Sequence, residues 1–165
     1  MQTNQNKAVF LDRDGVINHD PGDYTKSVSE FEILPGVLDT LKEWYQLGYK
    51  LIVITNQGGL AKGLYTVDDV EAMHQYFQGN CVMHGFEIEA FYYCPHHEAH
   101  NGKCLCRKPG SLMIERALHK FNINAELSLM FGDRDRDIVC AENAGVKGFK
   151  INTNSSIPKP QEILD

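Results

Sequence analysis

The 165-residue sequence has no apolar run long enough to cross a membrane, since a spanning helix needs about 20 consecutive apolar residues. Residues 1–7 are polar and lack the apolar segment of a secretory signal peptide. Basic clusters are also missing and the formal net charge is −6, which argues against a general affinity for nucleic acid. We therefore expect a cytoplasmic protein with no membrane or nucleic-acid partner. A small anionic ligand remains compatible with this composition, because a local site can be positive on an acidic protein.

The sequence also lacks internal repeats and any linker long enough to separate two domains. Its hydrophobic share of 42% and charged share of 23% are typical of a globular chain that can build a sizeable core. We expect a single domain over residues 1–165 that acts as a monomer. The core would span about residues 8–151, and residues 152–165 would form a polar surface tail with a short terminal turn.

Short apolar runs alternate with amphipathic segments along the whole chain, which predicts an α/β fold. Parallel strands joined by right-handed crossovers would form a Rossmann-like, three-layer α/β/α arrangement with helices on both faces of the sheet. Residues 19–32 are expected to form a loop. The expected strands are 8–11, 50–54, 86–93, 127–131 and 147–151, and the expected helices are 36–47, 66–84, 111–121 and 138–143.

Polar residues follow several predicted strands directly. Asp12 and Asp14 follow the first strand, and Gly15 permits the turn that ends it. If the extended geometry continues, the two carboxylates point the same way with Arg13 opposite. Their repulsion must be offset by a cation, a shared proton or both. Each polar residue taken alone is also explained by a turn, a helix cap or a surface charge. The strand ends together would carry Asp12, Asp14, Thr55, Asn56, Asp133 and Asp137, with Lys108 before a later helix.

Four motifs in this order resemble the haloacid dehalogenase (HAD) superfamily of phosphatases, over about residues 8–151. The motifs are Asp-Arg-Asp-Gly-Val at 12–16, Ile-Thr-Asn-Gln at 54–57, Arg-Lys-Pro at 107–109 and Gly-Asp-Arg-x-x-Asp at 132–137.

The resemblance implies a role for each motif residue. Asp12 would be the nucleophile that forms an aspartyl-phosphate, and Asp14 the general acid and base. Thr55 and Lys108 would hold the transferring phosphoryl group. Asp133 would be the main Mg²⁺ ligand.

Further contacts are implied around this centre. Asp12 and the backbone carbonyl of Asp14 would complete the Mg²⁺ site, with Asp137 supporting it. Asn56, Arg107 and Arg134 would contact the phosphate or the rest of the substrate.

Three of the five cysteines lie within thirteen residues, at positions 94, 104 and 106. Three thiolates and one imidazole match a closed structural zinc site. The spacing leaves His96, His97 and His100 open as the fourth ligand, and the family resemblance favours His96. We therefore expect a zinc-stapled loop over residues 94–106 that fixes Arg107 and Lys108, with ligands Cys94, His96, Cys104 and Cys106. Cys81 and Cys140 are expected to be buried apolar residues.

This zinc loop resembles one branch of the superfamily, whose members lack a large cap domain. That branch contains phosphatases of D-glycero-D-manno-heptose 1,7-bisphosphate and of histidinol phosphate. Residues 55–66, with a basic residue at position 62, favour removal of the 7-phosphate of the heptose bisphosphate, a step in making lipopolysaccharide. The short segment between His96 and Cys104 favours the histidinol type. Two non-enzymatic alternatives remain, a receiver-like domain and a zinc-stabilised binding module, and the intact acidic and lysine set argues against the latter.

Overall fold

The computed structural model describes residues 5–164. Five strands in this range form one parallel sheet in the order β3-β2-β1-β4-β5. This arrangement confirms the predicted α/β fold. The strands are β1 (Lys7–Leu11), β2 (Tyr49–Asn56), β3 (Ala90–Cys94), β4 (Leu129–Gly132) and β5 (Lys147–Lys150).

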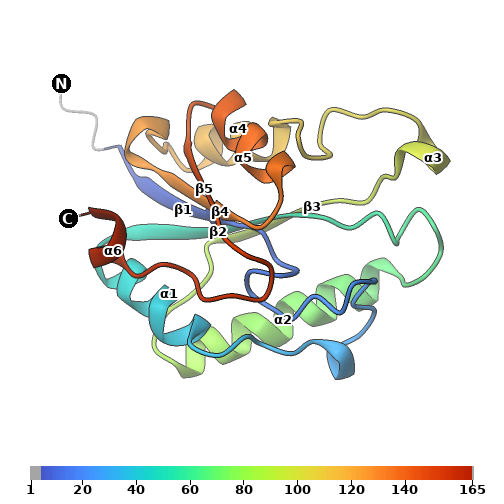
Figure 1. The fold of residues 1–165 in the computed structure, drawn as a ribbon, viewed down its shortest axis with the longest axis horizontal. Helices are drawn as coiled ribbons and strands as arrows, with labels where there is room; N and C mark the ends of the chain where they lie inside the picture. The colour runs from blue at the N-terminus through green and yellow to red at the C-terminus, as the bar shows by residue number, and fades with distance from the viewer. Residues whose placement is uncertain (1–4, 165) are drawn as a thin grey trace.

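Helices cover both faces of the sheet (Figure 1). On one face lie α1 (Val37–Gln46) and α2 (Val67–Met83), and on the other α4 (Leu112–Lys120) and α5 (Asp135–Asn143). The connections within residues 5–164 carry only short elements, and no cap domain is present among them. These elements are the 3₁₀ turns η1 (Val28–Glu30) and η2 (Ala125–Leu127) and the helices α3 (Glu98–Asn101) and α6 (Pro160–Leu164).

The central strand β1 is apolar on both sides because both of its faces are covered. Val9 and Leu11 pack in the core beneath α1 and α2, whereas Ala8 and Phe10 pack against α4 and α5. All four side chains are fully buried. The continuous apolar run therefore follows from burial on both faces of a parallel sheet.

The third strand is shorter than the sequence predicted, beginning at Ala90 instead of residue 86. Phe86 and Ile88 are buried as expected for strand residues. However, the Gln78 side chain donates to the Ile88 carbonyl at 2.7 Å and accepts from the Ile88 N–H at 2.8 Å. The backbone groups that would extend the ladder at Ile88 are thus satisfied by α2. A side chain takes the place of a neighbouring strand there.

The segment after β5 is anchored more firmly than the predicted surface tail. Ile157 and Pro160 are buried, and the Trp44 indole N–H donates to the Pro158 carbonyl at 3.0 Å. The segment crosses the molecule beside the sheet and ends with α6 against α1 (Figure 1). These few apolar and backbone contacts could not be predicted because the segment is mostly polar. No helix in residues 5–164 has the length and apolar character needed to cross a membrane.

Candidate active site and metal cluster

The carboxyl ends of the parallel strands bring the predicted polar residues to one edge of the sheet. Lys108 lies at the centre of this group and is buried. Its Nζ is 2.9 Å from Asp12 Oδ1, 2.7 Å from Asp137 Oδ1 and 2.8 Å from the Ile54 carbonyl oxygen. An ammonium group has three N–H donors. Two of them form hydrogen bonds, to Asp12 and to the Ile54 carbonyl, and the contact with Asp137 is an ion pair.

Asn56 fixes the backbone of Lys108. Its Oδ1 accepts from the Lys108 N–H at 2.9 Å, and its Nδ2 donates to the Lys108 carbonyl at 3.3 Å. The family resemblance also implies that Asn56 contacts the phosphate or the rest of the substrate, and the second Nδ2 hydrogen is left for such a contact. The amide ties the end of β2 to the segment that carries the lysine.

Burial and neighbouring charges shape the ionisation of this group. Burial raises the pKa of Asp12 to about 7, against the lowering effect of Lys108, and the nearby carboxylates of Asp137 and Asp14 raise it further. Burial alone would lower the pKa of Lys108, but Asp12 and Asp137 outweigh it and raise that pKa above its ordinary value. Lys108 therefore remains a cation, and the Asp12 carboxyl group gains or loses a proton near neutral pH.

Asp12, Asp133 and Asp137 form a buried carboxylate cluster in which one oxygen from each residue lies within 4.8 Å of the other two. Asp133 Oδ2 accepts from the Thr153 hydroxyl at 2.8 Å, whereas Asp133 Oδ1 is buried without a hydrogen-bond partner. A buried carboxylate oxygen without a donor is costly. A hard divalent cation bound by oxygen ligands would satisfy it. The donor set therefore fits Mg²⁺.

Two glycines allow the carboxylates to approach the backbone this closely. A Cβ on Gly132 would lie 2.2 Å from the Cβ of Asp137. Gly15 has a φ of +86°, and a Cβ there would lie 2.4 Å from Asp133 Oδ2. Glycine is thus required at both positions for steric reasons.

The Asp14 carboxylate is held by three side chains. Arg13 Nη2 donates to its oxygens at 2.9 and 3.3 Å, Asn18 Nδ2 at 2.9 Å and Gln57 Nε2 at 3.0 Å. Burial would raise the pKa of Asp14, but the Arg13 charge and these hydrogen bonds bring it below its ordinary value. The expectation that Arg13 lies opposite Asp14 is wrong, because β1 ends at Leu11 and the arginine side chain folds back onto its neighbour.

Thr55 is buried beside this group. Its hydroxyl accepts from Gln57 Nε2 at 3.0 Å, so one amide joins Thr55 to Asp14.

The sequence motifs did not assign roles to Arg13, Asn18, Gln57 or Thr153. The spacing of Thr55 and Gln57 was the one usable signal, since residues two apart at the end of a strand share a face.

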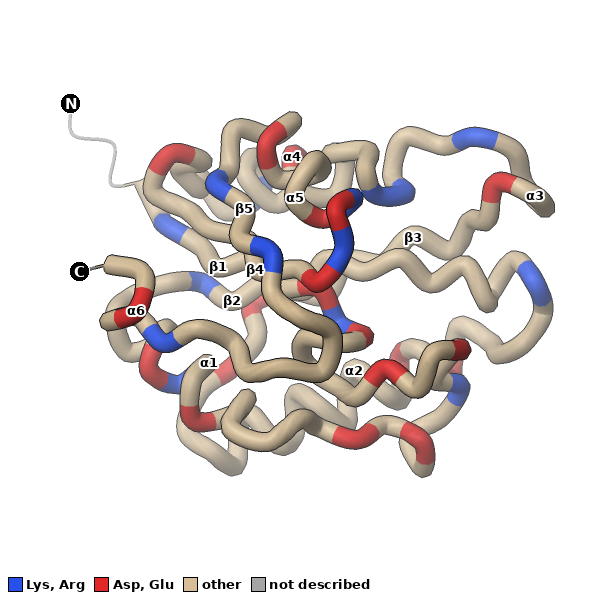
Figure 2. The backbone as a smooth tube through the Cα atoms, in the orientation of Figure 1, with Lys and Arg blue, Asp and Glu red and all other residues tan. Residues whose placement is uncertain are grey.

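An open cleft of about 290 Å³ lies over Asp14 and Asn56. Arg134 lines it, half exposed, with Nη2 3.4 Å from Asp20 Oδ2. Figure 2 shows the alternating acidic and basic residues 133–137, which run from the end of β4 into the first turn of α5. Arg107 lies beyond the cleft lining, where its Nη1 donates to the His96 carbonyl at 3.2 Å. The remaining lining residues are Gly22, Asp23, Tyr24 and Arg136.

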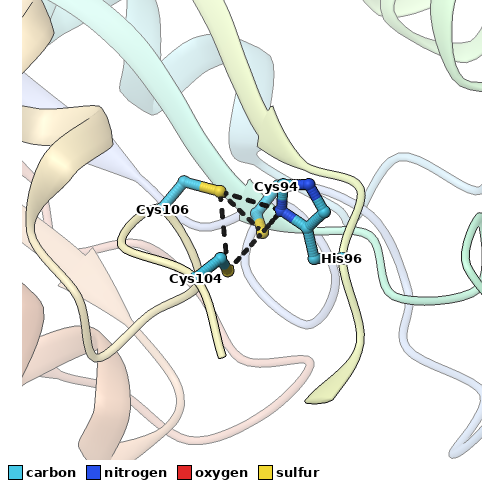
Figure 3. A group of neighbouring side chains, drawn as sticks. All are labelled: Cys94, His96, Cys104 and Cys106. Carbon is cyan, nitrogen blue, oxygen red and sulfur yellow. Dashed lines mark hydrogen bonds between the residues drawn. The ribbon is translucent and has the colours of Figure 1, made fainter. Parts of the chain in front are cut away.

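A second cluster joins the end of β3 to the segment before Lys108. Cys94, His96, Cys104 and Cys106 converge on one point (Figure 3). Their Sγ–Sγ distances are 3.0 to 3.7 Å, and His96 Nδ1 lies 3.2 and 3.5 Å from two of the sulfurs. Tetrahedral zinc with Zn–S bonds of about 2.3 Å would separate its sulfur ligands by about 3.8 Å. The two distances of 3.7 Å match a bound zinc ion, and Cys94 and Cys106, whose sulfurs are 3.0 Å apart, would have to separate slightly to bind it.

The structure shows which of the three candidate histidines faces the cysteine cluster. His96 Nδ1 points into the cluster. His97 instead caps α3, with Nδ1 accepting from the Ala99 N–H at 3.2 Å. The His100 ring packs against the His97 ring, with centroids 5.7 Å apart. As predicted, Cys81 and Cys140 are buried apart from the cluster.

Comparisons with known proteins agree with this geometry. A family model described as HAD-hydrolase-like matches residues 105–162. The chain is 43% identical to a D-glycero-beta-D-manno-heptose-1,7-bisphosphate 7-phosphatase of Helicobacter pylori over 98% of this chain and 92% of the relative. It is 38% identical to the Vibrio cholerae protein of the same name, over 92% of this chain and 83% of that protein.

Among solved structures, the chain is similar to the D,D-heptose 1,7-bisphosphate phosphatase of B. bronchiseptica, crystallised with magnesium and phosphate. The TM-score is 0.84 at 31% identity, covering 89% of this chain and 81% of the other. Identity of this extent over nearly the whole length goes well beyond a shared fold. The chain therefore belongs to the HAD-like phosphatases.

Proposed function

We propose that the protein is a Mg²⁺-dependent phosphomonoesterase that removes the 7-phosphate of D-glycero-D-manno-heptose 1,7-bisphosphate. The buried Lys108 between Asp12 and Asp137, next to the unsatisfied oxygen of Asp133, is the observation that carries the phosphatase assignment. The names of the relatives at about 40% identity support the substrate. The protein would act as a cytoplasmic monomer in making lipopolysaccharide.

In the proposed reaction an Asp12 carboxylate oxygen bonds to phosphorus as the bond from phosphorus to the sugar oxygen breaks. Asp14 gives its proton to the departing alkoxide. Water then attacks the aspartyl-phosphate, Asp14 takes the proton from that water, and inorganic phosphate leaves Asp12 free. The donors around Asp14 favour the ionised form that this second step requires. For the first step Asp14 must bind a proton from solvent, which the negative charge of the bound phosphate monoester would favour.

The phosphoryl oxygens would contact Lys108 and Thr55. Mg²⁺ would be held by Asp12, the Asp14 carbonyl and Asp133, with Asp137 in support. When bound, it offsets the negative charge of the carboxylates and of the phosphoryl group. Lys108 Nζ already lies within 2.9 Å of the Asp12 oxygen, so its charge faces the place where the phosphoryl group would accumulate negative charge.

We further propose that Cys94, His96, Cys104 and Cys106 hold a structural zinc ion. A closed set of four protein ligands leaves no position for substrate. The ion would fix loop 94–106 and, through the short connection after Cys106, the positions of Arg107 and Lys108.

A bisphosphate needs cations beyond those that hold the transferring group. The cleft presents Arg134 and Arg136, and Lys62 Nζ lies 5.0 Å from the centre of the Tyr24 ring at the cleft edge. Arg107 is a further candidate. Histidinol phosphate carries a cationic amine in place of a second phosphate and would be repelled by these groups.

The test compares kcat/KM for the heptose bisphosphate and for histidinol phosphate with Mg²⁺ present. We expect a strong preference for the heptose and no activity in Asp12→Asn. Asp135→Asn is the matched control, because Asp135 is exposed on the same acidic segment and pairs with Lys150. A preference for histidinol phosphate would overturn the substrate, and full activity of Asp12→Asn would overturn the nucleophile.

A further inference from the structure

A buried arginine lies behind the proposed general acid. The Arg13 side chain is 1% exposed, and its Nη2 contacts both Asp14 oxygens. Its Nε is buried without a hydrogen-bond partner, and the Phe31 ring lies 5.5 Å from the guanidinium carbon. A buried guanidinium with an unpaired N–H costs stability. Such a cost at a site residue suggests a functional reason for the arginine.

His74 of α2 lies on the other side of this guanidinium. Its Nε2 is 3.4 Å from Arg13 Nη1. Because arginine only donates hydrogen bonds, Nε2 must accept and the ring proton must be on Nδ1. Burial and the Arg13 charge lower the pKa of His74 to about 3, so the ring stays neutral and keeps its accepting nitrogen.

The orientation of the His74 ring is fixed by aromatic packing against β3. The Phe91 ring is stacked on it at 4.6 Å between centroids and 15° between planes, and the Tyr93 ring meets it edge-on at 5.9 Å. The imidazole therefore presents Nε2 in one direction. Aromatic contacts with this geometry restrict rotation as well as adding stability.

A second pair of side chains holds Asp14 through Gln57. The Tyr65 hydroxyl donates to Gln57 Oε1 at 2.6 Å, which directs Gln57 Nε2 to Asp14 at 3.0 Å. The carboxylate thus accepts hydrogen bonds from both an oriented amide and an oriented guanidinium. A small change in the orientation of Gln57 or of Arg13 would move the Asp14 carboxyl group, and with it the proton that Asp14 must donate.

We propose that His74 is a positioning residue that accepts a hydrogen bond from Arg13 and so directs Asp14 toward the leaving oxygen of the substrate. The proposal rests on the proposed phosphatase function. It predicts that the effect of His74 on the rate depends on the leaving group. A sugar alkoxide is a poor leaving group and needs the proton from Asp14, whereas p-nitrophenolate leaves without one.

The test measures kcat/KM of His74→Phe on the sugar bisphosphate and on p-nitrophenyl phosphate. Phenylalanine keeps an aromatic ring against Phe91 but has no accepting nitrogen. We expect a fall of about ten- to a hundredfold on the sugar phosphate, part of the full effect of general acid catalysis. Activity on p-nitrophenyl phosphate should be retained. Gln75→Leu is the matched control, since Gln75 is the exposed next residue of α2, and it should lower neither activity.

Arg13→Met is the second variant, in case His74→Phe does not fold. It should show the same selective loss, and adding His74→Phe to it should cause no further loss, because the two residues would act as one unit. Equal losses on both substrates, or no loss on either, would overturn the proposal. If the wild type rejects the heptose but hydrolyses another alkyl phosphate, only the proposed substrate fails, and the same ratio is measured with that alkyl phosphate. A wild type with no phosphatase activity would overturn both.

Discussion

Replacing Lys108 by methionine removes the one ammonium group between Asp12 and Asp137 while keeping a side chain of similar length. The Lys108 Nζ lies 2.7 to 2.9 Å from three oxygen atoms, and Lys108, Asp12 and Asp137 are all buried. Removing one member of a buried ion pair costs about 3–5 kcal/mol. We expect a loss of about 3 kcal/mol at pH 8, the low end of this range, because one carboxyl group can take up a proton.

The pH dependence of this loss follows from Asp12. Its pKa is already raised to about 7, mainly by burial, and Lys108 is a group that lowers it. Without the lysine the folded-state pKa rises further, so the destabilisation is present at high pH and shrinks as pH falls below that pKa. Urea unfolding of Lys108→Met at pH 8 and pH 6 should therefore show the larger loss at pH 8.

Catalysis should respond differently from stability. Loss of a buried cation that faces the transferring group should lower kcat/KM by about 10²–10³-fold. Adding Asp137→Asn to Lys108→Met removes the unpaired charge and should recover most of the stability but none of the activity. Activity of Lys108→Met within about threefold of the wild type, or equal destabilisation of the single and double variants, would refute this reasoning.

Three further predictions concern the metals and the core. Elemental analysis of protein purified without chelator should find about one zinc per chain, and Cys106→Ser should lower that content and the melting temperature; zinc-free wild-type protein would contradict the cluster assignment. Gly132→Ala should weaken Mg²⁺ binding measured by calorimetry, because the added methyl group displaces Asp137, whereas Gly79→Ala, with open space around its Cβ, should not. Below its unfolded-state pKa of 6.5, His74 binds a proton only when the chain unfolds, because its pKa in the folded protein is about 3. Between pH 6.5 and pH 5 the wild type should therefore lose about 2 kcal/mol of unfolding free energy that His74→Phe does not lose. Parallel pH profiles of stability for the two proteins would show that the ring is not buried in its neutral form.

The sequence predicted most of the fold because buried parallel strands have continuous apolar runs and clear glycine boundaries. Residues 86–89 were misassigned because the Gln78 side chain on the preceding helix α2 satisfies the Ile88 backbone, a contact that strand patterning does not predict. In the site, the motifs placed Asp12, Lys108 and Asp133 on one sheet edge. They could not reveal how the polar groups pair, as with Asn56 on the Lys108 backbone.

Groups that support Asp14 escaped prediction for a similar reason. Arg13 was expected to point away because strand alternation was extended to Asp14, three residues past the end of β1. His74 reads as one polar residue on an amphipathic helix, and its contact with Arg13 depends on how α2 packs against β3. Contacts between elements that are far apart in sequence leave no local pattern.

The Cys/His cluster and the carboxylate cluster are joined by a very short piece of chain, since Cys106 precedes Lys108 by two residues. The Asn56 amide clamps that same backbone to β2. If zinc, when bound, orders this connection, the two metal sites are thermodynamically linked. Linkage is reciprocal. If bound zinc raises the affinity for Mg²⁺ or phosphate by some factor, bound Mg²⁺ or phosphate must raise the affinity for zinc by the same factor. Loss of one metal ion would then lower the affinity of the protein for the other.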